Sequence, residues 1–262
     1  MMRMVIINGS PRKGITYKAI SIVKEELESL GDVNFQEFNL PQDMPCFCRG
    51  CFKCFEKGEE FCPDAGYVQP IVKALDESDG IIIGTPVYAM QISGGLKALF
   101  DHLAYCYINH RPRFYNKKAL VISTTVGAGI SNCNKYIKQN LSFWGVNRIY
   151  TVGKPLLAIK WEEIDKKKRD GFEKSLRLLA GKMFDDISSQ RVYRPDFLQT
   201  IMFNVSKAIM LSIEDVSADR DYWHNNGWLD GRKHFFEEEI KPGILNRSIG
   251  SISGLVFKRF IL

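Results

Sequence analysis

Two patterns of apolar and polar positions alternate along the first 155 residues of the chain. Short apolar segments indicate strands, and longer segments with apolar residues on one side indicate helices. The strand-like segments are 4–10, 33–40, 80–88, 117–129 and 147–157. The helix-like segments are 16–30, 68–78, 92–105, 134–145 and 162–190. Nearly continuous apolar strands that alternate with helices are typical of a parallel sheet covered by helices on both faces.

Five strands connected through helices predict an α/β fold with a flavodoxin-like, doubly wound parallel sheet of order 2-1-3-4-5. Ligands of such folds bind at the carboxyl ends of the strands, near the point where the strand order reverses. We therefore expect residues 1–195 to form one domain that carries the functional site. Residues 196–262 form a C-terminal, mostly helical extension.

The first part of the extension has an apolar stripe on one side of a predicted helix. Its members are Leu198, Ile201, Met202, Val205, Ile209 and Ser212. Such a stripe predicts packing against the main domain or against a second copy of the chain. The aromatic residues of "DYWHNNGW", at 221–228, also need a surface to cover.

Composition and charge narrow the class of protein. A content of 45% hydrophobic and 25% charged residues is that of an ordinary globular chain. The net charge of +6 is spread out, so we expect no nucleic-acid partner. The apolar run at the N-terminus is too short for a signal peptide, and the longest later run contains Asn204 and Lys207. These features predict a cytoplasmic protein without a membrane partner.

The loop after the first strand, "NGSPRKGIT", nearly matches a phosphate-binding P-loop. Its Gly9-x4-Gly14 spacing is right, but Ile15 stands where a P-loop has lysine. The loop keeps backbone N–H groups, the hydroxyls of Ser10 and Thr16, and a helix N-terminus, which suit one terminal phosphate bound without metal. A nucleoside triphosphatase is therefore not expected.

Two other ligand classes on this kind of sheet do not match. No G-x-G-x-x-G follows the first strand, so a dinucleotide-binding fingerprint is missing. A receiver domain would need acidic residues at the ends of strands one and three, where this chain has Asn8 and Gly84.

Two further loops emerge at the same edge of the predicted sheet. "GTPVYAMQISGG" follows strand three and offers a tight turn with flat or soft apolar side chains. "TTVGAGISN" follows strand four with two hydroxyls and two glycines. One monophosphate loop, one ring-facing turn and one glycine loop together predict a pocket for flavin mononucleotide (FMN).

The segments "GSPRKGIT" and "GTPVYAMQISGGLKALFDH", with the cysteine-rich segment between them, resemble the NADPH-dependent FMN reductase and iron–sulfur flavoprotein family. The resemblance covers about residues 2–155. It implies three groups of FMN-binding residues: Ser10, Arg12, Gly14, Ile15 and Thr16 at the phosphate; Pro86, Val87, Tyr88, Met90 and Gln91 at the isoalloxazine ring; and Thr125, Gly127 and Gly129 on the other side. Ile15 stands where the family usually has Asn, so one side-chain contact is missing.

The resemblance also implies an activity. Members pass electrons from NAD(P)H through bound FMN to a small acceptor such as a quinone or free flavin, and the flavin carries the chemistry. No catalytic side chain is therefore assigned, and the scattered histidines are expected to be structural or on the surface. Members are commonly homodimers or homotetramers. An electron-transfer flavoprotein that serves a redox protein, or a flavin-binding regulatory module, are the alternatives.

The segment 46–62 holds five of the seven cysteines. Cys48, Cys51, Cys54 and Cys62 have the spacing C-x2-C-x2-C-x7-C, which suits the thiolate ligands of a [4Fe–4S] cluster. Iron–sulfur flavoproteins resemble this pattern, with the cluster near the flavin. Relatives without a cluster also carry C-x-G-C-x-x-C here, so free thiols, zinc or a disulfide stay open. We expect these cysteines to lie together after strand two, on the flavin side of the sheet.

Overall fold

The computed structural model describes residues 1–212, 217–230, 233, 235–236, 240 and 242–260, with the side chains of 257–260 left out. The strands are β1 (Met2–Asn8), β2 (Val33–Asn39), β3 (Gly80–Pro86), β4 (Lys118–Thr125) and β5 (Arg148–Pro155). They form one parallel sheet in the order β2-β1-β3-β4-β5. The predicted flavodoxin-like fold and its strand order are confirmed.

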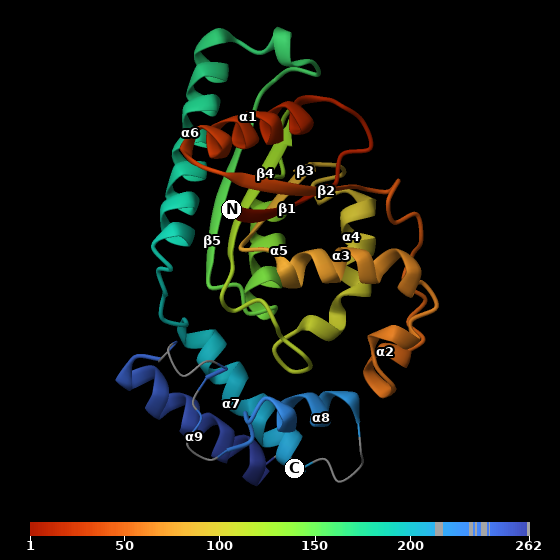
Figure 1. Ribbon diagram of the computed structural model, residues 1–262, viewed down its shortest axis with the longest axis vertical. Helices are drawn as coiled ribbons and strands as arrows, with labels where there is room; N and C mark the ends of the chain where they lie inside the picture. Colours follow the sequence, from red (N-terminus) through yellow and green to blue (C-terminus); the bar gives the residue numbers. More distant parts are fainter. Residues whose placement is uncertain (213–216, 231–232, 234, 237–239, 241, 261–262) are drawn as a thin grey trace.

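Helices cover both faces of the sheet (Figure 1). The helices α1 (Ile15–Leu30) and α6 (Lys166–Ser188) share one hydrophobic core with one face of the sheet. The helices α3 (Ala65–Glu77), α4 (Gly94–His102) and α5 (Ile130–Phe143) share a second core with the other face. Because both faces are covered, the central strands β1, β3 and β4 are almost continuously apolar and buried.

The extension forms a separate aromatic core. The extension contains the helices α7 (Phe197–Ser212), α8 (Ala218–Asn225) and α9 (Ile244–Phe260). The buried members of this core are Ile108, Phe203, Met210, Trp223, Trp228, Phe235, Phe236 and Ile240. Ile108 belongs to the main domain, so the extension packs on the segment after α4. The tryptophans of "DYWHNNGW" are therefore covered, as expected.

The predicted apolar stripe is not the buried face of α7. Leu198 and Ser212 are exposed, and the buried face is centred on Phe203 and Met210. Asn204 and Lys207 are also on the buried face, because each finds backbone acceptors: Asn204 donates to Thr200, and Lys207 donates to the carbonyls of residues 230 and 233. The other members of the stripe, Ile201, Met202, Val205 and Ile209, are half-buried, and packing of the stripe against a second copy of the chain stays a prediction.

Helix α9 packs along α7 through glycines. A Cβ at Gly250 would lie 2.8 Å from the side chain of Asn204, and one at Gly254 would lie 2.9 Å from the Asn204 carbonyl oxygen. The extension lies beyond the amino-terminal ends of β4 and β5, at the end of the molecule opposite the turn that joins β5 to α6 (Figure 1).

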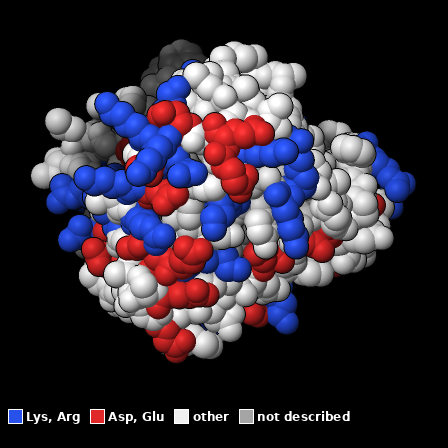
Figure 2. Space-filling model, turned by 90° about the horizontal axis from the view of Figure 1, so that it is seen from above, with Lys and Arg blue, Asp and Glu red and all other residues white. Residues whose placement is uncertain are grey.

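The surface carries charges of both signs. On the face that contains α1 and α6, lysine and arginine side chains are interspersed with aspartate and glutamate (Figure 2). Within the described ranges, no helix is both long and apolar enough to cross a lipid bilayer. His234, one of the histidines expected to be structural or on the surface, lies outside the described residues.

Candidate functional site

The loops after β1, β3 and β4 meet around one pocket at the carboxyl edge of the sheet. Of the residues predicted to bind FMN, those that line this pocket are Ser10, Arg12, Gly14, Ile15, Thr16, Pro86, Val87, Tyr88 and Thr125. They come from three segments far apart in the sequence, and the parallel sheet brings them together because all three loops follow carboxyl ends of strands.

The first loop presents unoccupied hydrogen-bond donors. Gly14 is the N-cap residue of α1, no side chain caps this end, and its first turn has no acidic residue. The first-turn N–H groups and the positive end of the helix dipole are thus available to an anion. The hydroxyls of Ser10 and Thr16 lie beside them, buried to 5% and 2% exposure. This geometry suits a phosphate.

The two hydroxyls already have partners within the protein. Ser10 Oγ donates to the carbonyl of Arg12 at 2.8 Å, and Thr16 Oγ1 lies 2.7 Å from Thr124 Oγ1. A hydroxyl has one proton and two lone pairs, so each can reorient toward an arriving phosphate.

The second loop makes a tight turn over the pocket. Tyr88 and Gln91 exchange two backbone hydrogen bonds of 2.9 Å, and the residues between them, Ala89 and Met90, have φ of 47° and 66°. Left-handed φ at non-glycine residues costs about 1–2 kcal/mol per residue and is found at ligand-binding turns. Tyr88 and Met90 remain 40% and 50% exposed. The turn thus offers flat apolar surface to a ring.

The third loop packs against this turn through Gly129. Its φ is 97°, and an added Cβ would lie 2.6 Å from Val87 Cγ1 and 3.0 Å from Met90 Cα. Glycine is therefore required at 129 by conformation and by space. Gly127 has open space around it, and its N–H donates to Thr125 Oγ1 at 3.3 Å. Four predicted residues are not among those that line the pocket: Met90, Gln91, Gly127 and Gly129.

Four lining residues are absent from the prediction: Thr124, Val126, Ala158 and Ile159. Thr124 and Val126 flank Thr125, which was predicted. Ala158 and Ile159 follow β5, so the same rule that selected three loops would have selected this fourth one. Val126 and Ile159 are 52% and 64% exposed, and they add apolar surface to the rim.

These observations fit FMN. A terminal phosphate matches the uncapped start of α1 and the two hydroxyls, and a flat heterocycle matches the exposed apolar rim. The residue assignments themselves stay a prediction.

The cysteine-rich segment leaves the carboxyl end of β2 and runs toward the extension. It contains the short helices α2 (Lys53–Glu56) and η1 (Glu59–Phe61). Cys48 and Cys51 are exposed, while Cys54 and Cys62 are partly buried, and none of the seven cysteines forms a disulfide. Burial, with the nearby Cys62, raises the pKa of Cys54 to about 11, so this thiol is neutral at pH 7.

The four predicted cluster ligands influence one another electrostatically. Within the described parts of the chain, the one group of cysteine, histidine and acidic side chains close enough to hold a metal is Cys46, Asp64 and His102. That spacing is the one around a single ion, and the thiolates of a [4Fe–4S] cluster lie farther apart, so the assignment of Cys48, Cys51, Cys54 and Cys62 stays a prediction.

A buried charge network ties this segment to the extension. Arg111, 2% exposed, binds Asp219 of α8 at 2.7 Å and Glu59 at 3.2 Å, and it donates to the carbonyl of Cys54. Arg113 binds Glu59 at 2.6 Å. The expected position on the flavin side therefore applies only to the start of the segment.

Comparisons with known proteins agree with the observed fold and identify the family. An iron–sulfur flavoprotein of Archaeoglobus fulgidus is 26% identical over 236 residues, which are 87% of this chain and 100% of that protein. An iron–sulfur flavoprotein of Methanocaldococcus jannaschii is 38% identical over 58% of this chain and 76% of that protein. One from Clostridioides difficile is 31% identical over 53% of this chain, and the chain spans only 60% of its length.

Solved structures show the same fold. The FMN-dependent NADH-azoreductase of Bacillus anthracis, in complex with FMN, superposes with a TM-score of 0.56 at 15% identity, over 70% of this chain and 99% of that one. The sequence model described as NADPH-dependent FMN reductase matches residues 2–162, more than half of the chain. The chain therefore belongs to the NADPH-dependent FMN reductase family of FMN-dependent oxidoreductases.

Proposed function

We propose that this protein passes electrons from NAD(P)H through FMN to a small acceptor such as a quinone or free flavin. The observation that carries the proposal is the single pocket formed by the loops after β1, β3 and β4. An azo compound is a further acceptor to test, because an NADPH azoreductase of a Bacillus strain is 26% identical over 55% of this chain.

Each loop has a distinct task in this proposal. The start of α1, with Ser10 and Thr16, binds the phosphate and fixes the position of the ring. The turn at Tyr88 and Met90 supports one side of the ring and leaves the other side open to a nicotinamide or an acceptor. The chemistry that FMN supplies when bound is reversible two-electron transfer.

Steady-state kinetics test this function. The FMN-loaded protein is mixed with NADH or NADPH and with one acceptor at a time: a quinone, free flavin or an azo dye. We expect NAD(P)H oxidation that depends on both FMN and the acceptor. FMN-loaded protein that oxidises neither nicotinamide with any of these acceptors would contradict the proposal.

A second candidate function is electron relay to a redox protein through a cluster on Cys48, Cys51, Cys54 and Cys62. It is favoured by the spacing of these thiols and by the names of the archaeal relatives. To separate the two candidate functions, iron and acid-labile sulfide are measured on anaerobically prepared protein. About four irons per chain, lost in Cys51→Ser, would support the relay. Iron-free protein that oxidises NAD(P)H with a small acceptor would support the first function.

A further inference from the structure

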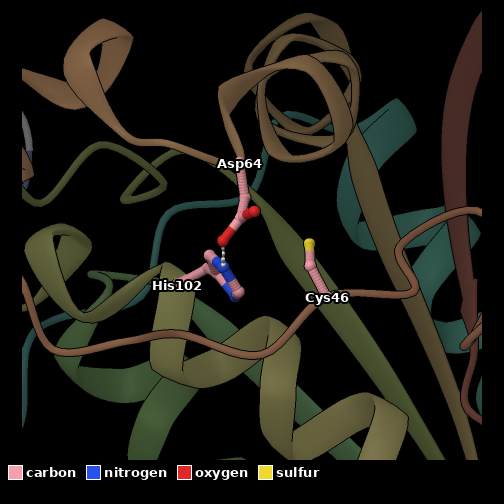
Figure 3. Close-up of side chains that lie close together, drawn as sticks. All are labelled: Cys46, Asp64 and His102. Atoms are coloured by element: carbon pink, nitrogen blue, oxygen red, sulfur yellow. Dashed lines mark hydrogen bonds and ion pairs between the residues drawn. The ribbon is translucent and has the colours of Figure 1, made fainter.

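Cys46, Asp64 and His102 converge where the cysteine-rich segment lies against the main domain. Cys46 comes from the segment after β2, Asp64 from the start of α3, and His102 from the end of α4 (Figure 3). One potential ligand atom of each lies within 4.8 Å of those of the other two. The side chains of His102 and Asp64 are only 1% and 11% exposed.

The hydrogen bonds of His102 leave its second ring nitrogen facing an anion. Nδ1 lies 2.9 Å from the carbonyl oxygen of Ala98, which only accepts, so Nδ1 carries the proton. In the neutral ring Nε2 then has a lone pair, yet it lies 3.2 Å from Asp64 Oδ2. Two acceptors at this distance repel each other unless a proton or a metal ion lies between them.

Asp64 is turned away from its usual local role. It occupies the N-cap position of α3, where an aspartate side chain normally accepts a hydrogen bond from the helix, but it makes no such bond. Its Oδ1 is 3.9 Å from the exposed guanidinium of Arg49, and its Oδ2 points to His102. The Asp64 carboxylate therefore does not cap α3, and it lies instead beside the thiol of Cys46 and the imidazole of His102.

We propose that Cys46, Asp64 and His102 bind one divalent transition-metal ion of the zinc type. A thiolate, an imidazole nitrogen and a carboxylate oxygen form a usual donor set for Zn²⁺, and ligand distances of about 2.0–2.3 Å separate tetrahedral ligands by roughly 3.3–3.7 Å. The distance of 3.2 Å between His102 and Asp64 already matches this separation closely. The Nδ1–H bond to Ala98 is the outer contact that fixes the tautomer of a metal-binding histidine.

The site is distinct from the predicted cluster ligands and from the flavin pocket. When the ion binds, the Cys46 S–H bond breaks, a metal–sulfur bond forms, and the proton leaves to solvent. The fourth position is left to water. The ion fastens the cysteine-rich segment to α3 and α4, at a point on the chain before the first predicted cluster ligand.

Cobalt titration tests the proposal. Full-length protein is stripped of metal, kept reduced, and titrated with Co²⁺ as a coloured substitute for Zn²⁺. We expect one Co²⁺ per chain with a thiolate-to-cobalt charge-transfer band, bleached by added Zn²⁺. Cys46→Ser should abolish the band. Loss of an outer contact of a metal ligand weakens metal binding by about 10–100-fold. Asp64→Asn and His102→Gln remove ligands themselves, so each should weaken Co²⁺ binding by at least as much.

Lys53→Ser is the matched control, because it removes an exposed side chain of the same segment that is no metal ligand, and Cys51→Ser tests whether the predicted cluster ligands hold the cobalt instead. Circular dichroism and FMN binding verify that each variant is folded, and neither depends on the metal. A band that persists in Cys46→Ser but disappears in Cys51→Ser would overturn the proposal, as would folded wild-type protein that gives no charge-transfer band.

Discussion

At the scale of single residues, the buried hydroxyls of Ser10 and Thr16 are the most direct test of the phosphate site. Replacing either with alanine should weaken FMN binding by about 1.5–3 kcal/mol, the value of a hydrogen bond to a charged group. Titration of the protein with FMN, followed by flavin fluorescence, measures the loss. Riboflavin lacks the phosphate, so its weaker binding should be unchanged in both variants.

Ser123→Ala is the matched control for Thr16→Ala. It removes a buried hydroxyl of β4 that donates to Asn134 at 2.7 Å and lies outside the pocket lining, so FMN affinity should be unchanged. Riboflavin that binds the wild-type protein as tightly as FMN would show that the loop is not a phosphate site.

Gly129 tests the contact between the second and third loops. A methyl group there meets Val87 at 2.6 Å with φ at 97°, so Gly129→Ala should displace the turn at 88–91. We expect at least a tenfold loss of FMN affinity, equivalent to about 1.4 kcal/mol, with the far-UV spectrum unchanged. Gly127→Ala, with open space around it, is the control and should bind FMN normally. Equal affinities for both variants would contradict this role of Gly129.

Sequence reasoning could select candidate residues from a local spacing, but it could not pair residues that meet only in the folded chain. Gly14 and Thr16 follow from the loop motif, because a phosphate loop has a recognisable spacing. The partnership of Thr16 with Thr124 joins residues 108 positions apart, and that of His102 with Asp64 joins residues 38 apart. No local spacing predicts such contacts, since they depend on how the elements pack.

At the scale of elements, the strands were predictable because burial on both faces leaves almost no polar position in β1, β3 and β4. The cysteine-rich segment has no such periodicity, so neither α2 nor its contact with α8 was foreseen. The buried face of α7 could not be read from the apolar stripe because Asn204 and Lys207 lie on it, and their burial depends on acceptors that only the folded chain provides.

The junction between the cysteine-rich segment and the extension should be sensitive to acid. Burial raises the pKa of Glu59, but Arg113 and Arg111 outweigh it and hold that pKa below its ordinary value. A carboxyl with a lowered folded pKa stabilises the fold above its unfolded value of about 4.3, and this stability is lost as the pH falls through the folded pKa. Denaturant unfolding at several pH values measures the effect.

Glu59→Gln should lower the free energy of unfolding at pH 7 and should weaken its dependence on pH below about 4.3. Glu60→Gln is the control, because the neighbouring carboxylate is exposed and should change neither quantity appreciably. Identical pH profiles for wild type and Glu59→Gln would show that the network with Arg111 and Arg113 does not stabilise the junction.

At the scale of the whole molecule, the pocket and the extension lie at opposite edges of the sheet. The pocket follows the carboxyl ends of the strands, while Asn147 at the amino end of β5 exchanges hydrogen bonds with Tyr193, just before the extension. The described part of the extension therefore does not cover the predicted FMN pocket of its own chain. It contributes the aromatic core that packs on Ile108, and we expect it to contribute to an assembly of several chains.

Removal of the extension tests the first contribution. Cutting the chain after Pro195 would uncover Ile108 and remove Asp219, the partner of the buried Arg111. Arg111 keeps Glu59 and the carbonyl of Cys54, but the loss of one charged partner of a buried arginine is destabilising. We expect a lower thermal midpoint in the truncated protein, with the sheet retained in far-UV circular dichroism. Unchanged stability would contradict this contribution.

Assembly tests the second contribution. The apolar side chains of α9 remain exposed along one stretch, with Ile244, Leu245, Ile252, Leu255 and Val256 each 49% exposed or more. Clustered exposed apolar side chains are typical of an interface between chains, so we expect a homodimer or homotetramer that buries them. Leu255→Glu would place a charge in that interface. Sedimentation analysis should show dissociation of this variant, while FMN binding in the distant pocket is retained. Ser248→Glu adds the same charge at an exposed polar position of α9 and should leave the assembly intact. A monomeric wild-type protein, or a Leu255→Glu variant of unchanged mass, would show that α9 is not the interface.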